Sequence, residues 1–181
     1  MATHSNAGAL GTIAPPFDLP GVDGKRHSLD SVRGENGTVV MFLCNHCPYV
    51  KAVVDKIPRD MRELAALGVG SAAIMSNDAA AYPEDSFANM KRFAAAHGFG
   101  FPYLYDESQE VAHALDAVAT PHAFVFDSEH RLVYQGAPDS DHTDESQGAA
   151  WLRSAIDAAL AGEQPDPQET PPRGCSIKWR D

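Results

Sequence analysis

Cys44 and Cys47 are separated by two residues and are the side chains of this sequence best suited to chemistry. The spacing occurs in redox-active dithiols, where a thiolate attacks a disulfide, and also in zinc sites. A structural zinc normally needs four ligands, and no ligand spacing surrounds the third cysteine, Cys175. The pattern therefore favours thiol–disulfide exchange, with a metal site and inert core cysteines as the alternative interpretations.

The residues on either side of the pair predict a strand before it and a helix after it. Residues 38–43 form an apolar run with a β-branched start, as in a strand buried on both faces. Pro48 suits the first turn of a helix, where its missing N–H costs nothing. We therefore expect Cys44 at the mouth of the helix, where free amides and the dipole stabilise a thiolate. On this interpretation Cys44 is the nucleophile and the more exposed, more acidic thiol, and Cys47 is the resolving thiol in the first helical turn.

The rest of the chain alternates helix and strand patterns around this centre. Apolar spacing predicts one helix over residues 50–65, kinked at Pro58, as the crossover to a second buried, parallel strand at 69–75. The other expected elements are an N-terminal hairpin around Asp23-Gly24, helices at 86–98, 108–115 and 149–161, and strands at 101–105, 123–127 and 131–135. We therefore predict an α/β fold with a central mixed β-sheet flanked by helices.

Composition limits the class of protein and its partners. A length of 181 residues with 44% hydrophobic content is enough for one globular domain with a real core. The formal charge of −11 argues against nucleic acid and against an anionic membrane, because both require a basic face. The sequence has no secretory signal pattern and no apolar run long enough to span a membrane, so we expect a cytoplasmic protein. Three cysteines in that compartment suit reactive thiols better than a disulfide framework.

Three motifs together resemble one known family. They are the stretch from Cys44 to Val50, the dipeptide Thr120-Pro121 before an apolar run at 123–127, and the ending from Gly174 to Trp179. This combination resembles the thioredoxin-like redoxins of the peroxiredoxin-like (AhpC/TSA-related) group, over nearly the whole chain. The resemblance implies a thioredoxin-like fold with an N-terminal β-hairpin and an extra αβ insertion. It places the redoxin domain at residues 1–162, followed by a proline-rich tail at 163–181 that packs on the domain.

The resemblance also implies a function and further site residues. It implies a thiol–disulfide oxidoreductase that acts on protein or small-molecule thiols and disulfides, and we expect no cofactor and no metal. His46 matches the C-x-H-C pattern of disulfide isomerases, whose thiolates are more stabilised than that of thioredoxin, although a solvent-facing histidine of little influence is the alternative. Thr120-Pro121 resembles the cis-proline element opposite the dithiol, whose backbone would be free to pair with an extended substrate.

Two other activities remain as alternatives. Peroxiredoxins carry the signature P-x-x-x-T-x-x-C, and counting back from Cys47 puts Cys44 at the threonine and Val40 at the proline. Their activating arginine falls at Pro121, so we expect poor peroxide turnover. A carrier of a soft metal such as copper or zinc could use Cys44, Cys47 and His46, with His122 as a further candidate ligand. Thr38 stands where thioredoxin buries an aspartate, so the proton-transfer assistance of that aspartate is absent at this position.

Cys175 lies in a tail without a helical or alternating pattern. Ile177 and Trp179 are apolar anchors that could dock this tail on the domain. Residues 163–175 are long enough to bring Cys175 to the dithiol. We favour a docked structural tail with a merely packed cysteine and a Cys44–Cys47 disulfide on mild oxidation, and Cys175 as a third redox thiol is the alternative.

Overall fold

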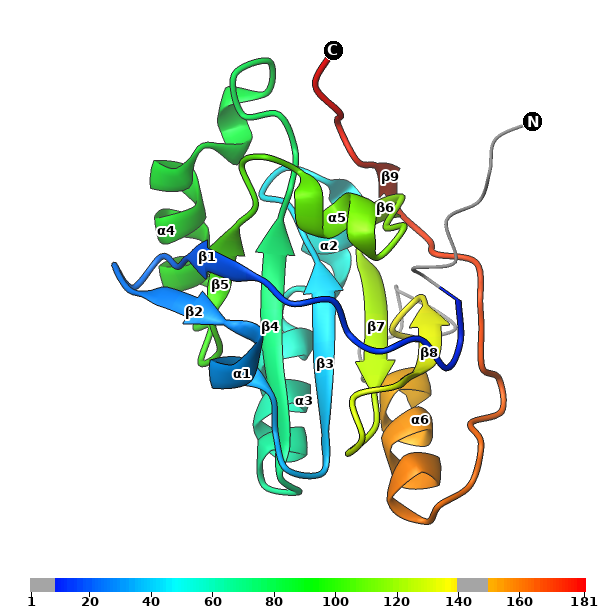
Figure 1. Cartoon of the computed structure of the whole chain (residues 1–181). Coiled ribbons are helices and arrows are strands. Elements are labelled where there is room, and N and C mark those ends of the chain that lie inside the picture. The colour runs from blue at the N-terminus through cyan, green and yellow to red at the C-terminus, as the bar shows by residue number, and fades with distance from the viewer. Residues whose placement is uncertain (1–8, 140–149) are drawn as a thin grey trace, which may run out of the picture.

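A five-stranded mixed sheet forms the centre of the computed structural model, which describes residues 9–139 and 150–181 (Figure 1). The strand order is β5-β4-β3-β7-β8. Strands β3 (Gly37–Phe42), β4 (Val69–Met75) and β5 (Tyr103–Tyr105) run parallel, and β7 (His122–Phe126) and β8 (Leu132–Gly136) complete the sheet with antiparallel pairing. The expected thioredoxin-like α/β arrangement is confirmed.

Alternate residues of β3 enter two hydrophobic clusters, one on each face of the sheet. Val39 and Met41 belong to the cluster that also contains apolar residues of α2 (Pro48–Val53), α3 (Lys56–Ala65), α4 (Phe87–Ala96) and α6 (Ala150–Leu160). Val40 and Phe42 belong to the cluster that contains residues of α1 (Leu29–Val32) and α5 (Glu110–Ala114). Because side chains alternate across a strand, an uninterrupted apolar run such as β3 needs helices on both faces.

The crossover after the cysteines is two helices, so the prediction of one kinked helix was wrong. Helix α2 ends at Val53, and α3 begins at Lys56. Pro58 therefore lies in the first turn of α3, where its missing N–H needs no partner. A continuous helix would set the proline ring against the carbonyl of Val54, four residues earlier, so the chain breaks there.

The expected additions to the basic fold are present. Strands β1 (Asp18–Pro20) and β2 (Arg26–Ser28) form the N-terminal hairpin. The segment between β4 and β7, where one extra helix and one extra short strand were expected, contains a 3-10 helix η2 (Pro83–Asp85), α4, β5, α5 and the short strand β6 (Ala119–Thr120).

The tail at residues 163–181 returns along the sheet from the end of α6 to the carboxyl end of β3 (Figure 1). It first follows β8, where Thr170 N–H donates to Gln135 O over 3.0 Å. It ends in strand β9 (Cys175–Ser176), which pairs antiparallel with β6. Ile177 is buried, and Trp179 stacks on His113 with ring centroids 4.2 Å apart. The tail therefore lies against the domain by both backbone pairing and side-chain packing.

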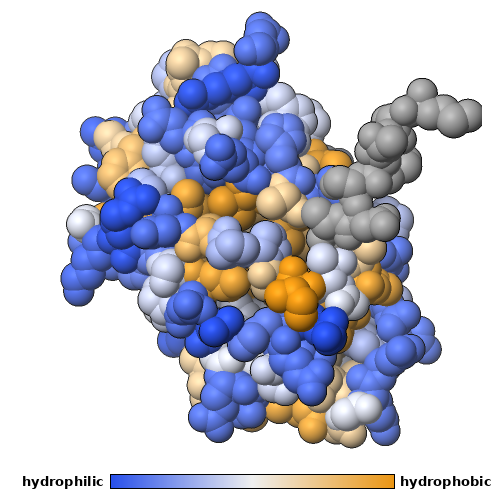
Figure 2. All heavy atoms as spheres, viewed as in Figure 1, coloured by the Kyte–Doolittle hydropathy of each residue, from blue (hydrophilic) through white to orange (hydrophobic). Residues whose placement is uncertain are grey.

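The surface is largely hydrophilic in the view of Figure 2, with apolar residues gathered near the centre of that face. None of the helices in the two described ranges is long and apolar enough to cross a membrane.

Candidate thiol site

All three cysteines meet at one end of the sheet. Cys44 follows β3, Cys47 is the N-cap of α2, and Cys175 comes from β9 in the tail. The Sγ atoms of Cys47 and Cys175 lie 2.7 Å apart. Cys47 Sγ also lies 3.4 Å from the backbone oxygen of Thr120, whose hydroxyl lies 3.3 Å from Cys44 Sγ. Three segments far apart in the sequence therefore meet, and we call the three cysteines together with Thr120 the sulfur cluster.

The expectation that Cys44 would be the more exposed thiol was wrong. Cys44 is 1% exposed and Cys47 is 0% exposed, whereas Cys175 is partly exposed. The reason is that Cys44 lies beneath the turn, against the Thr120 hydroxyl, while β9 lies over Cys47. The helix also begins one residue later than expected, at Pro48, so that Cys47 is the cap and not part of the first turn.

The expectation that Cys44 would be the more acidic thiol was also wrong. A hydrogen bond from the Cys44 thiol is the main cause that lowers the pKa of Cys47 to about 4, and the Cys175 thiol and the Val50 backbone amide act in the same direction against burial. The same hydrogen bond, burial and the nearby charge of Asp85 raise the pKa of Cys44. The thiolate therefore belongs on Cys47, at the positive end of α2.

The Cys175 thiol is the third titratable group of the cluster, and its protonation depends on Cys47. Burial raises the pKa of Cys175 to about 11, and the sulfur of Cys47 adds to the effect. A thiol that stays protonated beside a thiolate is a hydrogen-bond donor to it. Cys47 thus has a thiol donor on each side, one from the turn and one from the tail.

Asp85 organises the turn between the two cysteines. This carboxylate is fully buried and accepts hydrogen bonds from the Asn45 backbone N–H (2.8 Å) and the Asn77 side-chain amide (2.9 Å). His46 Nδ1 lies 2.8 Å from its Oδ2 atom. The Tyr103 hydroxyl donates to the Asn45 side chain over 2.9 Å, which fixes the turn from the other direction. The sequence analysis did not identify Asp85 as a site residue. The one feature of the sequence that pointed to it is that Asp85 follows the predicted parallel strand at 69–75.

His46 faces the protein and does not simply face solvent. Besides its ion-pair contact with Asp85, the imidazole stacks on Tyr82, with ring centroids 6.0 Å apart and planes 5° from parallel. The Lys178 ammonium group of the tail lies 5.9 Å from the centre of the same tyrosine ring. The proposed effect of His46 on the thiols stays a prediction, but the structure ties this residue to both the turn and the tail.

Thr120 and Pro121 lie opposite the dithiol, and the peptide bond between them is cis. The sequence analysis assumed that the backbone of Thr120 is free, and this was wrong. Thr120 pairs with Cys175, and Ala119 pairs with Ser176. Gly174 makes the close approach possible, since a Cβ atom at that position would collide with the Thr120 carbonyl. The protein's own tail therefore occupies the strand edge at which an extended substrate was expected.

The metal-carrier hypothesis included His122 as a ligand, but His122 is not part of the group of potential ligand atoms around Cys44. Its Nδ1 atom accepts a hydrogen bond from the Val118 N–H over 3.3 Å, and its Nε2 atom lies 3.2 Å from the Gln135 side-chain oxygen. Burial lowers the pKa of His122 to about 4. The potential ligand atoms that do lie together, within 4.8 Å, are those of Cys44, His46 and Asp85. Both carboxylate oxygens of Asp85 are already engaged, which makes this set a weak metal site.

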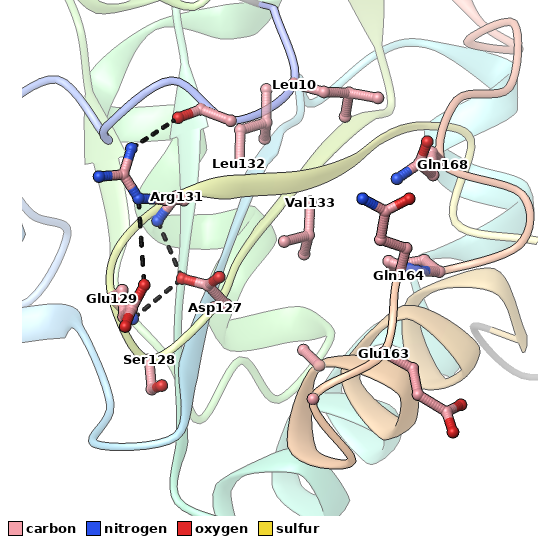
Figure 3. A pocket seen from close by; sticks show the side chains of 14 residues that line it. Leu10, Asp127, Ser128, Glu129, Arg131, Leu132, Val133, Glu163, Gln164 and Gln168 are labelled. Atoms are coloured by element: carbon pink, nitrogen blue, oxygen red, sulfur yellow. Dashed lines mark hydrogen bonds and ion pairs between the residues drawn. The ribbon is translucent and has the colours of Figure 1, made fainter.

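A cavity of about 650 Å³ lies at the opposite end of the sheet (Figure 3). Its lining includes Asp127, Arg131 and Gln164, from the β7–β8 turn and the start of the tail. Phe126, the residue before this turn, pairs with Thr38 near the start of β3, whereas Cys44 follows the end of that strand. The cavity is therefore separate from the sulfur cluster.

Comparison with known proteins places the chain in a family. The model of the AhpC/TSA family matches residues 10–135. Two solved structures are similar over nearly their whole length, an uncharacterized conserved protein from Geobacillus kaustophilus (44% identity, TM-score 0.90, covering 96% of this chain and 93% of that one) and a hypothetical protein from Sinorhizobium meliloti 1021 (38%, 0.87, 95% and 95%). A relative named thiol-disulfide oxidoreductase ResA, from Geobacillus thermodenitrificans strain NG80-2, is 26% identical over 72% of this chain and 70% of its own length. This chain belongs to the AhpC/TSA family.

Proposed function

We propose that the protein is a thiol–disulfide oxidoreductase whose redox pair is Cys44 and Cys47. The observation that carries the proposal is the Cys47 sulfur at the N-terminus of α2, with its pKa lowered to about 4 and a second thiol from the same turn donating to it. A thiolate with a neighbouring thiol is what disulfide exchange requires. The similarity to a protein named thiol-disulfide oxidoreductase supports the same activity.

The geometry favours the reverse of the expected roles. Cys47 is the attacking thiolate, and its sulfur forms a mixed disulfide with one half of the substrate while the other half leaves as a thiolate. Cys44 then loses its proton and attacks the Cys47 sulfur, which releases the second substrate thiolate and leaves a Cys44–Cys47 disulfide. Two protein thiols are oxidised for each substrate disulfide reduced, and the reverse sequence oxidises a substrate dithiol.

Substrates of two sizes fit this site in different ways. A protein disulfide in an extended segment would pair with Thr120 of β6, and this requires β9 to leave. A small disulfide could lie in the groove beside the turn, which is lined by His46, Lys51 and Arg92 among others, but it reaches the buried Cys47 sulfur only when β9 leaves. Lys51 and Arg92 outnumber the one carboxylate of this groove, Glu84, which favours substrates that carry carboxylates.

The experiment compares thiol–disulfide exchange with the two alternative activities, peroxide reduction and metal binding, in the same protein. We expect the protein to equilibrate with glutathione buffers as a two-electron couple and to reduce insulin disulfides. Cys47→Ser should abolish both, and a cooperative unfolding transition checks that the variant is folded. Exchange that survives Cys47→Ser would contradict the proposal. In the same preparation, rapid consumption of hydrogen peroxide would favour the peroxidase, and a bound metal in stoichiometric amount that protects the thiols from alkylation would favour the carrier.

A further inference from the structure

The tail brings a third sulfur into the cluster and is held there by more than one contact. Cys175 pairs with Thr120 through the backbone, and its Sγ atom lies 2.7 Å from that of Cys47. It is the one member of the cluster that is partly exposed, since Cys44 and Cys47 are at most 1% exposed. In the docked form an external molecule therefore meets Cys175 first.

The residues after Cys175 are held between the loop that follows β4 and the start of α5. The Ile177 N–H donates to the Val118 oxygen over 3.0 Å. Lys178 is bound on both sides, as its N–H donates to the Asn77 side chain (2.9 Å) and its carbonyl accepts from the Asp78 N–H (2.8 Å). The Gln109 side chain adds a bond to the Lys178 carbonyl over 2.9 Å. This set of contacts, which we call the tail clamp, holds Cys175 in register with Cys47.

We propose that Cys175 is a second redox partner of Cys47, beside Cys44, and that the disulfide exchanged with external thiols and disulfides is Cys47–Cys175. This proposal rests on the proposed function and names the third thiol that completes it. It reverses the preference of the sequence analysis for a merely packed cysteine. The tail clamp holds the Cys175 sulfur close to the Cys47 sulfur. Because Cys175 is the exposed member of this pair, an external thiol attacks there.

The exchange balances without a further reagent. In the oxidised protein, an external thiolate attacks the Cys175 sulfur, a mixed disulfide forms there, and the Cys47 thiolate leaves. A second external thiolate attacks the external sulfur of that mixed disulfide, so the external disulfide forms and Cys175 takes up a proton. An external disulfide reverses both steps and oxidises the protein.

The properties of the two sulfurs suit these roles. Exchange is faster when the leaving thiol has a low pKa and the attacked sulfur is accessible. Cys47, with its pKa lowered to about 4, is the better leaving group, and Cys175 is the accessible sulfur. Cys44, buried behind Cys47, can attack only the Cys47 sulfur, which moves the disulfide inward and frees the tail.

Peptide mapping identifies the pair. Trypsin cleaves after Arg33, Lys51, Arg173 and Lys178, so Cys44 and Cys47 share the peptide 34–51, and Cys175 lies alone in the peptide 174–178. The protein is equilibrated with glutathione buffers of graded ratio, quenched with acid, alkylated and digested. We expect a cross-link between the two peptides as the main oxidised species, and the same cross-link in Cys44→Ser.

Gly174→Ala tests the role of tail placement without removing a thiol. A methyl group there collides with the Thr120 carbonyl, whereas the matched control Gly100→Ala points into open space. The equilibrium constant for forming the Cys47–Cys175 disulfide with glutathione disulfide measures the effective concentration of one thiol at the other. Because a displaced tail lowers that concentration, we expect the constant to fall about tenfold or more in Gly174→Ala and to stay unchanged in Gly100→Ala.

The outcomes separate this inference from the proposed function. If oxidation links Cys44 to Cys47 within the peptide 34–51, and Cys44→Ser gives only glutathione adducts, the function stands and the inference fails. A cross-link of equal strength in Gly174→Ala also overturns the inference. If no variant forms any protein disulfide, the proposed function itself fails.

Discussion

At the scale of single residues, Cys47 gathers most of the favourable contacts in the cluster. Its thiolate accepts from two thiols and faces the amides of the first turn of α2. Because this pKa is lowered, the ionised form persists as the pH falls from the ordinary thiol range and is lost only near pH 4. The reactive thiolate is therefore available over the whole neutral range.

A pH titration of the ultraviolet thiolate absorbance measures this distribution. We expect the absorbance of one thiolate to remain on acidification until about pH 4. Cys47→Ser should lose it over the whole neutral range, because burial, which the substitution leaves in place, raises the pKa values of the other two cysteines. A titration step in the ordinary thiol range in the native protein, retained in Cys47→Ser, would show that the charge lies elsewhere.

Asp85 acts on the second thiol of the turn. Asp85→Asn removes the buried negative charge that helps to raise the pKa of Cys44, so Cys44 should be alkylated at a lower pH than in the native protein. Loss of a charge-assisted hydrogen bond should also cost about 2 kcal/mol of unfolding free energy. Glu84→Gln, one residue earlier on the exposed side of η2, is the matched control and should change neither quantity. Mass-spectrometric alkylation rates and urea unfolding measure the two effects.

At the scale of elements, β9 behaves as a detachable strand on a stable sheet. It pairs through two residues with β6, which is itself two residues long, and the clamp supplies the remaining contacts. Few backbone bonds and one buried anchor, Ile177, imply local opening well below the free energy of global unfolding. Access to Cys47 is therefore governed by an element that can leave without melting the core.

Ile177→Ala tests this separation. Removing a buried isoleucine costs about 2–5 kcal/mol, and here that loss should fall on tail docking. We expect alkylation of Cys47 to accelerate while the main thermal transition stays within a few degrees of the native one. The half-exposed Leu160→Ala on α6 is the control and should change neither. A large fall of the main transition without faster alkylation would mean that the tail unfolds only with the whole domain.

Element patterns were readable from the sequence where the apolar period was strong, as in β3, β4 and the β7–β8 pair. The break between α2 and α3 was misplaced because the effect of Pro58 acts four residues upstream, on Val54. Asp85 and the contact between Cys175 and Cys47 could not be predicted, since both depend on segments that meet only after the sheet has formed. The exposure and acidity of the thiols depend on those same contacts, so the predictions about them were wrong for the same reason.

At the scale of the whole molecule, buried titratable groups set the dependence of stability on pH. His122 is held neutral inside the domain, with its pKa lowered to about 4 from an ordinary value of 6.5. Between these values the unfolded chain binds a proton that the folded protein does not, so stability falls as the pH falls. The full contribution is present above pH 6.5 and is lost on acidification to about 4.

Denaturant unfolding across this window tests the argument. We expect roughly 3 kcal/mol of unfolding free energy to be lost between the two pH values through His122, and His122→Gln to reduce the slope and lower the neutral plateau, while the slope that the lowered pKa of Cys47 adds in the same window remains. His97→Gln, at a partly exposed position, is the matched control. An unchanged slope in His122→Gln would assign the effect to another group.

The stack between Trp179 and His113 makes the docked tail optically visible. The chain has two tryptophans, and Trp179 lies four residues beyond Cys175, within the segment that must move with β9. When the tail leaves, this indole exchanges an imidazole neighbour for water, and its fluorescence emission should shift to longer wavelength. With Trp151→Phe as background, a single tryptophan would report docking and release of the tail in real time, with no label attached near the thiols.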